Sequence, residues 1–197
     1  MIIRPRLRPI LAAALTLGLA TPALAHPGHG ERAGFVAGLL HPLTGMDHLL
    51  AMLMVGLWAG IAFPKRWWVC PAAFVSFMLA GFGWGAGGGG FPFAEGLILA
   101  SLVGLGGALL FDLRPPLALG TGAVAVFALG HGYAHGAEMP AGGHPLGFVA
   151  GFVLTTITLH AAGIAVAWQS RRMDSRVLGR VIGGAATATA AAMVWQA

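Results

Sequence analysis

Histidines and acidic residues gather in two short segments at the edges of apolar runs. The members of these segments are His41, Asp47 and His48 in the first, and His131, His135 and Glu138 in the second. Ionisable groups at the entrance of a membrane helix are costly, so their presence indicates a functional site. Imidazole and carboxylate together form a ligand set for divalent transition metals. The two segments therefore predict a metal site.

The second segment presents its ligands on one face of a helix. His131, His135 and Glu138 are spaced i, i+4 and i+7, and residues at that spacing lie above one another along a helix. Two imidazoles and one carboxylate are therefore predicted to point in the same direction.

The first segment combines a bend with an adjacent acid and imidazole. Asp47 and His48 are neighbours, so they cannot both point the same way. One of them is expected to face the metal while the other orients a neighbouring ligand. Pro42 and Gly45 are expected to bend the backbone so that His41 returns toward Asp47.

The composition is that of an integral membrane protein with an all-α fold. Of the 197 residues, 57% are hydrophobic and 9% are charged, whereas a soluble domain has about 25% charged residues. The few basic residues are confined to short loops, so the positive net charge does not indicate nucleic-acid binding. A single cysteine excludes a disulfide framework.

The N-terminal segment 1–25 has the features of a cleavable secretory signal peptide. Three arginines precede an apolar stretch at 10–20, and alanines at positions 23 and 25 form a small-x-small cleavage site. Cleavage there would leave a mature chain of residues 26–197. His26 and His29 would then lie at its N-terminus, either as accessory metal ligands or as an unstructured tail. An uncleaved first helix is the alternative.

Six apolar stretches after the signal peptide are long enough to cross a bilayer. They are residues 45–63, 67–85, 91–111, 116–136, 145–168 and 177–195. Short links join them, so the mature chain is predicted to be one six-transmembrane-helix bundle. The apolar residues 34–40 are too few to span and stop before Pro42, which predicts a short interfacial or re-entrant helix before the first span.

Basic residues occur in alternate links between the predicted spans. Lys65 and Arg66 follow the first span, Arg114 follows the third, and four arginines surround the link after the fifth. The positive-inside rule places these links in the cytoplasm. The mature N- and C-termini are then periplasmic, in a multi-pass protein of the bacterial inner membrane.

This topology brings the candidate ligands from three spans to one level near the outer face. The predicted metal ligands are His41, Asp47, His48, Glu95, His131, His135 and Glu138. His160 lies deeper in the fifth span, one turn after Thr156. It could be a second position on a transport path, or the two side chains could satisfy each other.

The paired motifs resemble those of the HupE/UreJ family of nickel permeases. They read HPLTGMDH from His41 and HGYAHGAE from His131. The resemblance covers essentially the whole mature chain, although Gly130 stands where many members have an aromatic residue. It implies import of nickel, in some members cobalt, for hydrogenase or urease maturation. The functional positions that it implies are His41, Asp47, His48, His135 and Glu138, with Glu95 as a carboxylate of the third span.

The function expected from these features is secondary transport of Ni²⁺ or Co²⁺, with Zn²⁺ as a further candidate. The sequence has no P-loop motif that would indicate an ATPase, and no permanent cofactor is expected. The expected partners are the cation and the lipid bilayer; whether the protein forms a homo-oligomer stays open. Two alternatives stay open as well, an intramembrane zinc hydrolase using Ser76 or Glu138 and a metal receptor without transport activity.

Overall fold

The computed structural model describes residues 30–139, 145–170 and 175–196. These residues form seven α-helices and no β-strand, which confirms the predicted all-α fold class. The helices are α2 (Gly30–Thr44), α3 (Met46–Ala62), α4 (Val69–Ala86), α5 (Ala94–Leu110), α6 (Leu117–Ala137), α7 (Pro145–Ser170) and α8 (Ser175–Gln196). The predicted signal peptide lies outside the described residues, as do His26 and His29.

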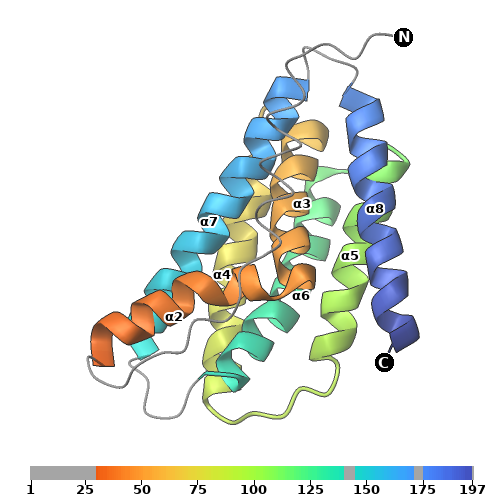
Figure 1. Cartoon of the computed structure of the whole chain (residues 1–197). Coiled ribbons are helices and arrows are strands. Elements are labelled where there is room, and N and C mark those ends of the chain that lie inside the picture. Colours follow the sequence, from red (N-terminus) through yellow and green to blue (C-terminus); the bar gives the residue numbers. More distant parts are fainter. Residues whose placement is uncertain (1–29, 140–144, 171–174, 197) are drawn as a thin grey trace, which may run out of the picture.

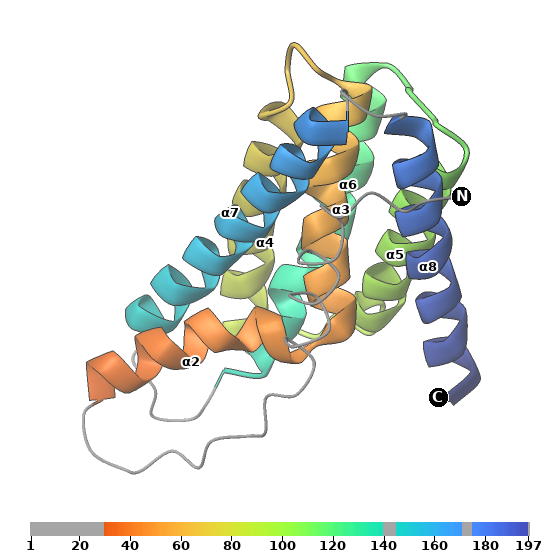
Figure 2. The same ribbon diagram turned by 45° about the horizontal axis from the view of Figure 1, so that its top comes forward.

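Helices α3 to α8 run alternately up and down in one bundle, as Figure 1 shows. Helix α4 packs along α6, α3 packs along α7, and α5 packs against both α6 and α8. Helix α2 crosses the end of the bundle where α3 begins and α6 ends, and it packs on α7 (Figure 2). This end carries both of the segments that contain the candidate metal ligands.

The chain bends sharply at Gly45, between α2 and α3. The axes of these two helices differ by 83°. Gly45 has φ −95° and ψ 116°, an extended conformation that ends one helix and caps the next. The predicted break at Pro42 is wrong, because this proline lies inside the last turn of α2. The lead-in helix is therefore longer than residues 34–40.

Three helices, α4, α6 and α7, are long and apolar enough to cross a membrane, and the bent pair α2 and α3 adds a fourth candidate. Helices α3 and α5 have 17 residues each, a length of about 26 Å at 1.5 Å per residue. Helix α5 begins later than predicted, since Phe91, Pro92 and Phe93 precede it. The six-span topology fits the alternating helices and remains a prediction.

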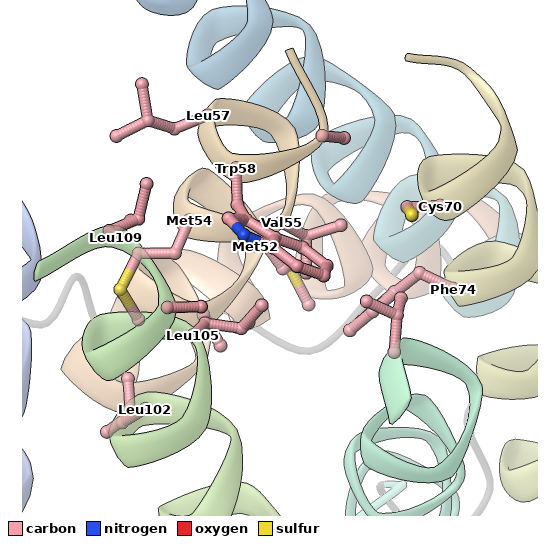
Figure 3. Packing of buried hydrophobic residues seen from close by; sticks show 14 of the residues in the cluster. Met52, Met54, Val55, Leu57, Trp58, Cys70, Phe74, Leu102, Leu105 and Leu109 are labelled. Atoms are coloured by element: carbon pink, nitrogen blue, oxygen red, sulfur yellow. The ribbon is translucent and has the colours of Figure 1, made fainter. Parts of the chain in front are cut away.

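Close packing of the helices depends on glycine at several crossings. A Cβ atom on Gly56 of α3 would collide with the His160 carbonyl of α7, and one on Gly132 of α6 would collide with the Met78 carbonyl of α4. Such contacts let backbones approach closely, which is a main source of helix association in lipid. The apolar interior lies between these helices, and Figure 3 shows Met54 of α3 beside leucines of α5.

Candidate metal site

Four imidazoles meet where α2, α3 and α6 converge. The ring centre of His135 lies 4.6 Å from that of His41 and 4.4 Å from that of His48. The ring centre of His48 is also 4.8 Å from that of His131. We call these four residues, His41, His48, His131 and His135, the histidine cluster. The prediction that the two sequence segments converge is confirmed for them.

Asp47 orients His48 within this cluster. One carboxylate oxygen, Oδ1 of Asp47, accepts hydrogen bonds from the backbone N–H and from the Nδ1–H of His48, both at 2.9 Å. This contact leaves the lone pair on Nε2 of His48, and that atom is buried without a hydrogen-bond partner. The carboxylate thus favours the tautomer of His48 that presents a free nitrogen, and which of the two side chains faces a metal stays a prediction.

Ser101 of α5 orients His131, as Asp47 orients His48. The Ser101 hydroxyl donates to the carbonyl of Ile98 at 2.6 Å and lies 3.0 Å from Nε2 of His131. With its one proton directed at the Ile98 carbonyl, the hydroxyl is placed to accept from the Nε2–H tautomer of His131. The lone pair then lies on Nδ1 of His131, which is buried and unpartnered.

Ser101 was not among the residues predicted from the sequence, although it is a single hydroxyl in a largely apolar helix. Gly130 explains how α5 comes close enough for this contact. A Cβ atom at Gly130 would lie 2.7 Å from Cβ of Leu97 and 3.0 Å from the carbonyl oxygen of Ala94. A larger side chain at this position would push α5 away from α6, so glycine here allows Ser101 and His131 to come together.

The solvent side of the cluster carries a carboxylate. Nε2 of His41 lies 3.3 Å from Oε2 of Glu138, and these side chains are 26% and 58% exposed. Ligand atoms of His41, His135 and Glu138 all lie within 4.8 Å of one another. Atoms bound about 2.1 Å from an ion are at most about 4.2 Å apart. A small inward movement would therefore allow the three side chains to coordinate one cation.

The cluster holds imidazole nitrogens that the fold leaves unsatisfied. Nε2 of His48, Nδ1 of His131 and both ring nitrogens of His135 are buried and lack a hydrogen-bond partner among the described residues. Each such group costs about 1–3 kcal/mol when it is buried unpaired. A bound cation would satisfy several of these nitrogens at once, which is the observation that most directly indicates a metal site.

Aromatic rings close the cluster on the side of the bundle interior. The ring centre of Phe152 lies 4.2 Å from that of His135, and the ring centre of Phe74 lies 5.6 Å from that of His131. Both phenylalanines are fully buried. Burial of the ligands thus increases from Glu138 inward, so that a cation would enter from the α2 end and meet progressively drier surroundings.

The remaining predicted ligands lie apart from the cluster. Glu95 is exposed in the first turn of α5, and its side chain makes no hydrogen bond or ion pair within the described ranges. His160 is buried deeper, on α7. Ser76 is exposed on α4 and donates to the Ala72 carbonyl, so it does not supply the cluster with a hydroxyl. The metal role of Glu95 and His160 therefore stays a prediction.

Comparison with known proteins identifies relatives along almost the whole chain. The family described as HupE / UreJ protein matches residues 13–193. A curated relative, Protein HupE of Rhizobium leguminosarum bv. viciae, is 38% identical over 177 residues, which cover 89% of this chain and 93% of the relative. No solved structure matches the chain.

Proposed function

The chain belongs to the HupE / UreJ family, and from that premise we propose that it is a secondary transporter that imports Ni²⁺, and also Co²⁺, through the histidine cluster. The buried, unpartnered imidazole nitrogens of the cluster support this proposal most strongly. The proposed setting is the bacterial inner membrane, with the cluster near the outer face and hydrogenase or urease maturation as the use of the metal.

The first step of the proposed transport is exchange of hydration water for protein ligands. The half-exposed pair His41 and Glu138 would receive the cation, and His135 would bind it as water leaves. The carboxylates of Glu138 and Asp47 would offset its charge where the surroundings become apolar. His48 and His131 would follow as ligands, because Asp47 and Ser101 hold their free nitrogens ready.

The donor set favours a late first-row transition metal. Imidazole nitrogen with carboxylate oxygen suits nickel, cobalt and zinc, whereas magnesium prefers oxygen ligands and keeps its water. Imidazole binds a metal only in its neutral form, so protonation would assist release. The choice between nickel, cobalt and zinc depends on geometry and supply as well as on affinity.

An intramembrane zinc hydrolase is the competing function. Three ligands of the type His41, His135 and Glu138 with one open position would also suit hydrolytic zinc. Ser76, one of the two groups considered for catalysis, is exposed and bonds to its own helix, so it cannot act at these three ligands. A hydrolase must keep its zinc through turnover, whereas a carrier must release its cation.

Uptake by liposomes that contain the purified full-length protein tests the proposal. We expect nickel and cobalt to accumulate inside these vesicles above the level of empty vesicles, and zinc to be lost on dialysis against a chelator. Accumulation equal to that of empty vesicles, together with zinc that resists the chelator, would favour the hydrolase instead. A reporter fused to the C-terminus should be periplasmic if the six-span topology is correct.

A further inference from the structure

Further side chains that could bind a cation lie on the inner side of the histidine cluster, on two helices. On α3, Met52 follows His48 by one turn; on α7, Thr156 and His160 follow Phe152 by one and two turns. Residues at this spacing lie on one helix face. Phe152 contacts His135 of the cluster, so this face leads directly inward from it.

One turn inward from Phe152, one hydroxyl and two thioethers from three helices lie close together. Oγ1 of Thr156 lies 3.4 Å from Sδ of Met52 on α3 and 3.7 Å from Sδ of Met78 on α4. All three side chains are fully buried. Thr156 donates to the Phe152 carbonyl at 2.9 Å, as is common for threonine within a helix, so its oxygen lone pairs remain available.

One turn further inward lies His160, which has no polar partner. Its side chain is 2% exposed, and both ring nitrogens are buried without a hydrogen bond. Thr156 therefore does not hydrogen-bond to His160, so the two side chains do not satisfy each other. The other role considered for His160, a second position on a transport path, is the one that remains. The Phe74 ring contacts both His160, at 5.0 Å between ring centres, and His131 of the cluster, at 5.6 Å.

We propose that Met52, Met78, Thr156 and His160 form a second cation-binding position, which we call the inner station, between the histidine cluster and the opposite end of the bundle. The proposal rests on the transport function proposed above. Its ligands would be thioether sulfur, hydroxyl oxygen and imidazole nitrogen. Figure 3 shows Met52 and Phe74 turned into the interior from α3 and α4.

The chemistry of the inner station suits passage rather than storage. All four side chains are neutral, and a divalent cation without a nearby carboxylate is held weakly in apolar surroundings. Conduction requires sites that bind well enough to admit an ion and weakly enough to release it. Thioether and imidazole donors also favour nickel or cobalt over magnesium and manganese, so the station would act as a selectivity step after the cluster.

The test uses the full-length protein in liposomes with external Ni²⁺ and two variants. One is His160→Leu, and the other combines Met52→Leu with Met78→Leu, which removes both sulfurs at nearly constant volume. We expect nickel uptake to fall about tenfold or more, the scale reported for loss of a ligand-shell partner. Equilibrium nickel binding to the purified protein at limiting Ni²⁺ reports the histidine cluster, and it should stay within about twofold because neither variant removes a ligand of the cluster.

Met54→Leu is the matched control, because Met54 is also fully buried on α3 but lies beside leucines of α5 (Figure 3). It should keep uptake near the wild-type rate. Wild-type uptake in both test variants would overturn the inner station, and so would an equal loss of equilibrium binding, since the residues would then belong to the cluster. If His160→Leu fails to fold, as judged by thermal unfolding, the methionine variant decides. Absence of uptake by the wild-type protein would instead overturn the proposed transport function, and the station with it.

Discussion

Ser101 and His131 lie on neighbouring helices, and the serine hydroxyl accepts a hydrogen bond from the imidazole Nε2–H across 3.0 Å. Both side chains are 0% exposed. The contact fixes which nitrogen of His131 remains free, and it does so without placing a further charge in the interior. The interior-facing half of the cluster is therefore positioned by a neutral hydrogen bond, and the solvent-facing half by carboxylates.

Ser101→Ala should weaken nickel binding by about 10–100-fold, the usual effect of losing a group that orients a metal ligand. The variant should also lose about 1–3 kcal/mol of unfolding free energy, because the Nε2–H of His131 would be buried unpaired. Calorimetric titration with nickel and denaturant unfolding measure the two effects. Ser76→Ala is the control, since Ser76 is exposed and bonds only to its own helix; equal binding in both variants would refute the positioning role.

Asp47→Asn and His135→Ala should each abolish nickel accumulation in liposomes while the protein stays folded. Asparagine can still accept a hydrogen bond from His48, but it lacks the negative charge that offsets the cation. His135→Ala removes the ring that contacts both His41 and His48. Near-normal accumulation in either variant, with folding checked by thermal unfolding, would show that the cluster is not the transport site.

Gly45→Ala should weaken nickel binding without large loss of stability. A Cβ atom at this position would lie 2.8 Å from Oδ1 of Asp47 and 3.0 Å from Nδ1 of His48, so the pair must shift. Alanine adopts the φ and ψ values of Gly45 readily, so the unfolding free energy should change by about 0.5 kcal/mol or less. Gly83→Ala is the control, because nothing lies within 4 Å of its added Cβ. Identical nickel affinities would contradict this account of the bend.

Nickel binding should weaken as the pH falls through the imidazole range. Protons compete with the metal for neutral imidazole nitrogen, whose ordinary pKa is about 6.5. Binding should therefore be stronger at about pH 7.5 than at about pH 5.5, a range that brackets the ordinary imidazole pKa. Titration of the purified protein with nickel across this range measures the effect, and a pH-independent affinity would argue against imidazole ligands.

The spacing of His131, His135 and Glu138 predicted their common face, because three residues on one helix need only helical geometry to align. Convergence with His41 and His48 also followed from the shared level of the two segments. The contact between Ser101 and His131 could not be predicted, since it depends on how closely α5 approaches α6. The predicted helix break at Pro42 was wrong for a local reason: proline disfavours the middle of a helix, yet this one lies within the last turn of α2. Glu95 shared the predicted level of the cluster, but its place on α5 leaves it exposed.

The histidine cluster is the proposed binding site of the transported cation. X-ray absorption at the nickel edge, on purified protein loaded with about one equivalent of Ni²⁺, measures the ligand shell directly. We predict nitrogen and oxygen ligands with the outer-shell scattering of more than one imidazole ring, consistent with mixed ligation by histidine and carboxylate. His135→Ala should lose part of the imidazole scattering. A spectrum without imidazole scattering, or one unchanged in His135→Ala, would contradict the account.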